Sequence, residues 1–177
     1  MHRLFAALPV PDAIAERLEL LRDPLHGARW RRRDQFHITL CFYGDVSAEI
    51  AEEIARGLET CHVPELALSI AGVGWFGRRE PRAIYARIVP NPDLDALARD
   101  CQSVARRSGL RLSKSSFMPH ITLAYCHNTP LETARSSSEK YQILKTEIFY
   151  PDRFHLYESV SRAGKTNQYV AQAEYHL

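Results

Sequence analysis

Short segments in which apolar and polar residues alternate recur along the chain, as is typical of half-buried strands. The clearest are two copies of the tetrapeptide His-Ile-Thr-Leu, at residues 37–40 and again at residues 120–123. In each copy His and Thr share one face of the predicted strand, and Ile and Leu share the other. The sequence therefore predicts two equivalent strands, each turning an imidazole and a hydroxyl to one side and two apolar side chains into a core.

The segments around these two strands carry the periods of helices and of further strands. Helices are expected from Pro11 and Asp12 onward, after Ser47 as N-cap, and over residues 93–108, because apolar residues recur there at the helical spacing. Residues 30–33 are expected to form a short strand or loop. The other expected strands cover residues 3–8, 66–73, 83–89, 143–150, 154–160 and 169–176.

The connections between these elements are expected where Gly, Ser and Thr gather. Residues 74–82 are rich in Gly and Arg, and residues 128–140 are rich in Ser and Thr, so both are expected to be loops. Gly44 and Asp45 are expected to close the first motif strand, and Gly164 to lie in the turn before the last strand. Each half of the chain then contains a strand, a helix and a strand with one motif. We predict an α+β fold with pseudo-twofold symmetry, in which the two histidines face each other across a cleft.

Composition and charge restrict the kind of partner. With 177 residues, 45% hydrophobic and 25% charged, the chain is long enough for one domain with a proper core. A net charge of +2 is small for a protein that grips long nucleic acid by its backbone, which favours a small or terminal nucleic-acid feature. Four scattered cysteines without a Cys-x-x-Cys pair indicate reduced thiols in a cytoplasmic protein. The sequence predicts no membrane span and no signal peptide.

The duplicated His and Thr carry the chemistry. A single His on a strand is more often structural than catalytic, and Thr is a good strand former. Duplication of a purely structural unit would retain the apolar Ile and Leu, but it has no need to retain His and Thr on the opposite face. Imidazoles exchange protons near neutral pH, and hydroxyls bind phosphate oxygens. The four side chains, His37, Thr39, His120 and Thr122, therefore indicate phosphate ester chemistry.

A metal site is the rival use of two histidines. The motifs supply no carboxylate or thiolate at helical or turn spacing, so the ligand count is too low. Cys126 and His127 follow the second motif, but adjacent strand residues point to opposite faces and cannot easily chelate one ion. No metal is expected.

The sequence at this point resembles a known family, the two-histidine (2H) phosphoesterases. Within it, the flanking residues are similar to the RNA 2′,3′-cyclic phosphodiesterases, historically called 2′–5′ RNA ligases. The resemblance extends over essentially the whole chain. The segments that carry it are Arg3-Leu4-Phe5-Ala6-Ala7, Phe36-His37-Ile38-Thr39-Leu40 with Phe42 and Gly44, Pro119-His120-Ile121-Thr122-Leu123, Phe154-His155-Leu156-Tyr157 with Ser159, and the turn at residues 164–169.

The resemblance implies a single domain over residues 1–177, with two similar lobes whose antiparallel sheets face a central cleft and whose helices lie outside. It implies a hydrolase that opens a 2′,3′-cyclic phosphate at an RNA 3′ end and leaves a 2′-phosphate, with His37 as the acid and His120 as the base. Thr39 and Thr122 would hold the non-bridging oxygens. Some members join tRNA half-molecules through a 2′–5′ bond. No metal or nucleotide cofactor is implied, and we expect a cytoplasmic monomer whose partner is the RNA end.

Weaker assignments concern the flanks of the site. Phe42 matches a family position from which an aromatic ring stacks on the terminal base, worth about 1–3 kcal/mol, although core packing is an equal alternative. Arg82 matches a family arginine, and surface solvation is its alternative. Tyr125 stands where many relatives carry an arginine, so either its hydroxyl or another arginine must take over any phosphate contact. A basic cluster, either RNA-guiding or simply solvated, comprises Arg29, Arg31, Arg32, Arg33, Arg78 and Arg79.

Two other functions compete with this one. The same catalytic residues could act on a small cyclic phosphate, such as a nucleotide or ADP-ribose derivative, and the small net charge permits that substrate. A non-catalytic binder of RNA ends is the alternative outside enzymes. Both His and Thr pairs are intact, which argues against a binder, since a binder has no need of proton-transfer groups.

Overall fold

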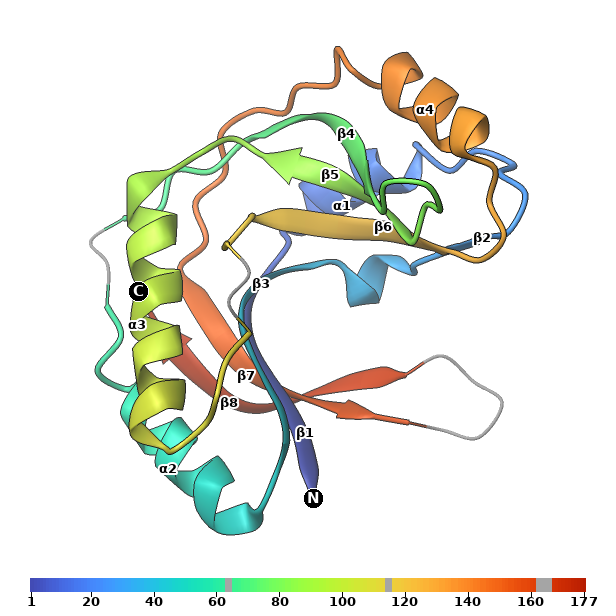
Figure 1. Ribbon diagram of the computed structural model, residues 1–177. Helices are drawn as coiled ribbons and strands as arrows, with labels where there is room; N and C mark the ends of the chain where they lie inside the picture. The colour runs from blue at the N-terminus through green and yellow to red at the C-terminus, as the bar shows by residue number, and fades with distance from the viewer. Residues whose placement is uncertain (63–64, 114–115, 162–166) are drawn as a thin grey trace.

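An antiparallel sheet forms the framework of the computed structural model, which describes residues 1–62, 65–113, 116–161 and 167–177 (Figure 1). Its strands are β1 (His2–Pro9), β2 (Ala28–Trp30), β3 (His37–Val46), β4 (Ile70–Phe76), β5 (Ala83–Ile88), β6 (His120–Cys126), β7 (Arg153–Val160) and β8 (Gln168–His176). The helices are α1 (Asp12–Glu19), α2 (Ala48–Leu58), α3 (Pro92–Arg107), α4 (Leu131–Lys140) and the 3-10 turn η1 (Arg33–Gln35). In the described residues, none of these helices is long and apolar enough to cross a membrane.

The sheet has two halves that meet at a single residue pair. Its order is β4-β5-β6-β3-β1-β7-β8, with β2 also paired to β6. Strands β3 and β6 are joined only through Ile38 and Ile121, the central residues of the two His-Ile-Thr-Leu motifs. Figure 1 shows the strands of the two halves fanning out from this junction, with α2 and α3 beside one another. The predicted α+β fold with two similar lobes is thus confirmed.

The apolar positions of both motifs are buried, as their alternation predicts. Ile38, Leu40, Ile121 and Leu123 belong to one hydrophobic core. Helix α3 packs on the first motif strand, β3, and contributes to this core, whereas helix α4 packs on β4. Ser47 caps α2 by accepting a hydrogen bond from the Ile50 amide, at 3.4 Å, as expected.

Each motif strand also contains a bulge immediately after its Thr. Thr39 pairs with Ala7, but Cys41 pairs with Ala6, so Leu40 is an extra residue in β3. Thr122 pairs with Tyr85, but Ala124 pairs with Ile84, so Leu123 is the equivalent extra residue in β6. A bulge shifts the alternation by one residue. Consequently the residues that follow, Phe42 and Tyr125, lie on the same side as the His and Thr of their strands and are about half exposed.

The expected loop at residues 128–140 is wrong, because residues 131–140 form helix α4. Only Ala134 and Ser137 of this helix are fully buried, so its inner face consists of small side chains instead of an apolar stripe. The pattern of large apolar residues cannot reveal such a helix. Helix α4 is stabilised by its contact with β4 and not by the helix propensity of its own residues.

The expected strand at residues 143–150 is also wrong. This segment makes only two isolated bridges to the neighbourhood of β4, from Lys145 to Ala71 and from Phe149 to Leu68. Ile143 and Ile148 are exposed while Phe149 is buried in the core, so the apolar residues of this segment do not form one buried strand face. The segment instead covers the outer edge of β4.

Several boundaries differ from those expected. Strand β3 continues through Gly44 to Val46, and β4 begins at Ile70 and continues through Gly74 to Phe76. Position 74 requires glycine although it lies inside a strand, because a Cβ atom there would lie only 2.7 Å from the Tyr85 hydroxyl oxygen. The loop is therefore confined to residues 77–82. The turn expected around Gly164 lies outside the described residues.

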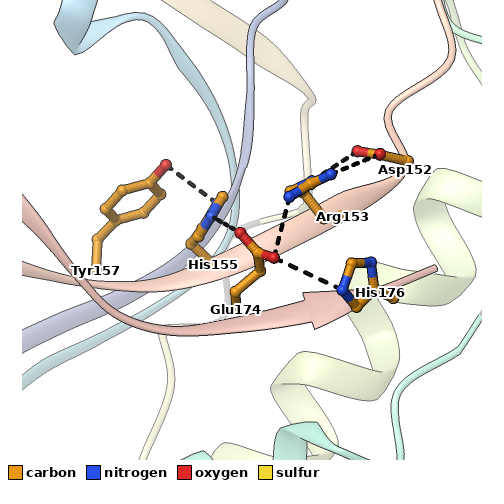
Figure 2. Close-up of polar contacts among 6 residues, drawn as sticks. All are labelled: Asp152, Arg153, His155, Tyr157, Glu174 and His176. Atoms are coloured by element: carbon orange, nitrogen blue, oxygen red, sulfur yellow. Dashed lines mark hydrogen bonds and ion pairs between the residues drawn. The ribbon is translucent and has the colours of Figure 1, made fainter.

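Strands β7 and β8 form a hairpin whose register is marked by charged cross-strand pairs (Figure 2). Arg153 binds Asp152 at 2.8 Å and Glu174 at 3.0 Å, and Glu174 also accepts from His155 Nε2 at 3.1 Å. The Tyr157 hydroxyl lies 3.3 Å from His155 Nδ1, and the Tyr157 ring stacks on Phe5 of β1. The hairpin therefore supports the ring of Phe5, which in turn contacts the first motif.

Candidate active site

The two motif histidines lie at the junction of the sheet halves. Because β3 and β6 are antiparallel and pair at Ile38 and Ile121, His37 lies on the side of Thr122, and Thr39 lies on the side of His120. The charge on His120 also acts on the pKa of His37, as two neighbouring imidazoles require. The four side chains predicted from the repeat are thus brought together by a single strand junction.

Both imidazoles are oriented by the same backbone contact. His37 Nδ1 lies 2.8 Å from the Gln35 carbonyl oxygen, and His120 Nδ1 lies 2.7 Å from the Met118 carbonyl oxygen, in each case two residues earlier in the chain. A carbonyl oxygen can only accept, so Nδ1 carries the hydrogen in both rings. The Nε2 atom of each ring is therefore available to accept a proton from a bound substrate or water, or to donate one. The repeat in the sequence gives no sign of these contacts.

Aromatic rings surround each histidine. The ring centroids of Phe5 and Tyr169 lie 5.1 Å and 5.2 Å from that of His37. Those of Phe76 and Tyr85 lie 4.8 Å and 5.5 Å from that of His120. These rings pack against the imidazoles and restrict their orientation. They come from four strands distant in sequence, β1, β8, β4 and β5, so sequence reasoning did not find them.

Burial shifts the pKa of both histidines. Burial lowers the pKa of His37 to about 4, opposed by its bond to the Gln35 carbonyl and assisted by the charges of Arg31 and His120. Burial likewise lowers the pKa of His120, opposed by its bond to the Met118 carbonyl. An imidazole whose pKa lies below the working pH is neutral and can accept a proton, whereas an acid must hold one. In the empty site the protonation of His37 thus favours the base role, the reverse of the assignment implied by the family resemblance.

One pocket adjoins the pair at Thr39 and His120. It has a volume of about 540 Å³, and Phe42 forms part of its wall. The Arg3 guanidinium lies over the Phe42 ring at 5.5 Å, which leaves that ring half exposed toward the pocket. The predicted stacking position of Phe42 is therefore accessible. The other side chains that line this pocket include Phe76, Gln102, Arg111 and Phe117.

A second pocket lies beside Tyr125 and is larger, with a volume of about 820 Å³. Tyr169 lines it, and the Tyr169 ring is also the one that contacts His37 edge-on. Arg29 and Arg31, two members of the predicted basic cluster, also line this pocket.

The remaining basic residues lie elsewhere. Arg82 is exposed immediately before β5 and is not among the described residues that line these two pockets. Arg32 pairs with Asp34 at 2.7 Å, and Arg33 pairs with Glu16 at 2.9 Å. Arg78 and Arg79 are exposed in the loop after β4.

The arrangement offers two imidazoles, two hydroxyls and nearby guanidinium groups. Within the ranges that the structure describes, no three His, Cys, Asp or Glu side chains come together as a metal site would require. Two oriented Nε2 atoms on either side of a bound phosphate can transfer protons in opposite directions. The site is therefore built for acid and base catalysis on a phosphate ester.

Comparison with known proteins agrees with this geometry. Residues 8–85 match the family described as LigT like Phosphoesterase. A protein of Escherichia coli named RNA 2′,3′-cyclic phosphodiesterase is 32% identical over 133 residues, which cover 69% of this chain and 70% of that protein. One of the same name from Thermotoga maritima is 27% identical and covers 89% of this chain and 86% of its own.

The solved structures give the same result for the fold. The crystal structure of Escherichia coli LigT complexed with 3′-AMP superposes with a TM-score of 0.81 and 28% identity, covering 99% of this chain and 98% of that one. The likeness thus extends over both halves of the sheet and both motif strands. The chain therefore belongs to the LigT-like phosphoesterases of the two-histidine superfamily.

Proposed function

We propose that this protein is an RNA 2′,3′-cyclic phosphodiesterase, which hydrolyses a terminal 2′,3′-cyclic phosphate to a 2′-phosphate. The observation that carries the proposal is the matched pair of imidazoles, each donating from Nδ1 to the carbonyl two residues earlier and each presenting Nε2. The relatives named for this activity support the choice of substrate.

The reaction needs one base and one acid on opposite sides of phosphorus. The base removes a proton from water, whose oxygen forms the new bond to phosphorus. The bond from phosphorus to the 3′ oxygen breaks, and the acid supplies the proton that this oxygen takes. Each transfer contributes about 10²–10⁴ in rate. Thr39 and Thr122 donate hydrogen bonds to the non-bridging oxygens as charge develops on them.

We assign His37 as the base and His120 as the acid, because His37 has the pKa of about 4 in the empty site. A substrate with a nitrophenyl leaving group, which departs without a proton, separates the roles. We expect it to restore activity to His120→Ala far more than to His37→Ala. The opposite pattern would give the acid role to His37, as the family resemblance implied, and equal restoration would remove the division of roles.

The test of the function is incubation with an RNA that ends in a 2′,3′-cyclic phosphate. Phosphorus NMR should then show a 2′-phosphate, because water attacks in line with the departing 3′ oxygen. A 3′-phosphate would mean that the substrate lies the other way round between the histidines. Absence of turnover would refute the proposal.

A small cyclic phosphate, derived from a nucleotide or from ADP-ribose, is the second candidate substrate. Crystal structures of Escherichia coli LigT contain 3′-AMP, ATP and NADP+, all small nucleotides. Comparing turnover of a cyclic mononucleotide with that of an oligonucleotide distinguishes the candidates. A non-catalytic RNA-end binder would turn over neither.

The partner and setting complete the proposal. The partner is the RNA 3′ end, with tRNA halves as the candidate RNA, and the protein acts as a monomer in the cytoplasm. Joining of tRNA halves through a 2′–5′ bond, measured with purified halves, tests the reverse reaction. Sedimentation of the pure protein tests the monomer.

A further inference from the structure

The pseudo-twofold symmetry extends beyond the two motifs to one aromatic residue in each half. Phe42 and Tyr125 each lie five residues after the motif histidine, and the matched bulges turn both toward the histidine side of the sheet. Their exposed fractions are nearly equal, 49% and 47%. An arginine lies over each ring, Arg3 over Phe42 at 5.5 Å and Arg31 over Tyr125 at 5.3 Å. The two halves thus present equivalent aromatic platforms.

Arg31 differs from Arg3 in being buried, with an exposed fraction of only 5%. Its amide donates to the Leu123 carbonyl at 2.8 Å, which holds it beside β6. Its Nη2 donates to the Tyr169 hydroxyl at 2.9 Å, and its guanidinium lies between the rings of Tyr125 and Tyr169. The geometry of this cation is therefore fixed by its surroundings before any ligand arrives.

No carboxylate among the described residues pairs with Arg31, although Arg32 and Arg33, the next two residues, both have acidic partners. A buried charge without a counter-charge is costly. Among the described residues the guanidinium donates one hydrogen bond, to Tyr169, which leaves most of its donors for another acceptor. Arg31 is therefore prepared for an anion supplied by a ligand.

The surrounding pocket has the chemistry of a nucleotide site. None of its described lining residues is acidic, whereas Arg29, Arg31 and His127 line it together with both tyrosines. It adjoins the catalytic pair at His37 through the Tyr169 ring, while the Phe42 pocket adjoins the pair at His120 and Thr39. Each pocket thus adjoins one of the two histidines, the arrangement that a ligand occupying both pockets would require.

We propose that the pocket formed by Arg31, Tyr125 and Tyr169 is a second nucleotide subsite, which binds the penultimate nucleotide of the RNA. The phosphate that joins this nucleotide to the terminal one binds the Arg31 guanidinium. The base of the penultimate nucleotide stacks on the exposed face of Tyr125. The inference rests on the proposed function and specifies the substrate, because an RNA of at least two nucleotides fills both pockets and a cyclic mononucleotide fills only one.

Binding of products tests the subsite without depending on turnover. A mononucleotide 2′-phosphate and a dinucleotide with a terminal 2′-phosphate are titrated into the protein by calorimetry. We expect the dinucleotide to bind at least about 10-fold more tightly, as one stacked base would give. Tyr125→Ala and Arg31→Gln should each remove most of that advantage. Arg31→Gln should also make the slope of log K against log salt less negative by about 0.7, the loss of one phosphate contact on a single strand.

Matched controls separate the subsite from general effects. Arg32→Gln removes the adjacent charge, which pairs with Asp34 outside the pocket, and should retain the full dinucleotide advantage. Arg31→Lys keeps the charge but loses the planar fork, so it shows whether Arg31→Gln fails only through misfolding. Tyr125 is half exposed, so its truncation leaves the core intact.

Each outcome bears on the proposal. A dinucleotide advantage that survives both Tyr125→Ala and Arg31→Gln would overturn it. Equal weakening of mononucleotide and dinucleotide binding in Arg31→Gln would also overturn it, since Arg31 would then bind the reactive phosphate. Absence of cyclic phosphodiesterase turnover, with the dinucleotide advantage retained and dependent on both side chains, would refute the proposed function and support the subsite.

Discussion

The depressed pKa of His37 gives a quantitative prediction for stability. Burial lowers this pKa from 6.5 to about 4, so the folded protein prefers the neutral imidazole by about 3 kcal/mol relative to the unfolded chain. At pH 7 only about one folded molecule in a thousand carries this proton in the empty site. The prediction follows from burial and not from any assumption about catalysis.

The sign of the effect follows from the direction of the shift. A group whose pKa is lower in the folded state binds protons more readily when the chain is unfolded. The contribution of His37 to stability is therefore fully present above pH 6.5 and is lost as the pH falls toward 4. His37→Gln removes the titrating group and keeps a polar side chain of similar size.

The assay is urea unfolding at pH 7 and at pH 4. We expect the wild type to lose about 3 kcal/mol more free energy of unfolding between these two pH values than His37→Gln does. His26→Gln replaces an exposed histidine and should follow the wild type. An NMR titration of the His37 ring should place its pKa near 4. A ring that titrates at 6.5 or above, with wild type and variant falling in parallel, would refute the reasoning.

Three further predictions concern activity and binding. His37→Ala and His120→Ala should each lower kcat by about 10²–10⁴, and the double variant should be little worse than either, because both act in one step; additive losses would place them in separate steps. Activity should survive excess EDTA, since the imidazoles supply both protons, and restoration by zinc after a loss would contradict this mechanism. Phe42→Ala should weaken binding of a mononucleotide 2′-phosphate by about 10-fold if the terminal base stacks there, and unchanged affinity would return Phe42 to a structural role.

The motif strands could be predicted because their period is strict and their apolar residues are large. Ile38 and Ile121 are fully buried at the junction, as alternation requires. Helix α4 could not be predicted, because Ala134 and Ser137 make its inner face and neither produces an apolar signal. The exposed Ile143 and Ile148 show the opposite error, since apolar residues suggested a strand that the core does not contain.

The candidate site was predictable only as far as the sequence repeats itself. The duplication singled out the His and Thr of each motif. It could not give the position of Arg31, whose importance depends on β2 pairing with β6 and on Tyr169 arriving from β8. Nor could strict alternation give the shared orientation of Phe42 and Tyr125, because it depends on an extra residue in each strand.

The two outer edges of the sheet also differ in their exposure to other chains. The edge of β4 is covered by residues around Lys145 and Phe149, whereas β8 has a strand neighbour on one side only in the part of the chain that the structure describes. An open edge can add a strand from another molecule and begin aggregation. The charged side chains of Arg153 and Glu174 on the terminal hairpin oppose such addition. These surface ion pairs contribute little to folding stability. Their loss would therefore lower the solubility of the protein and leave its melting temperature nearly unchanged.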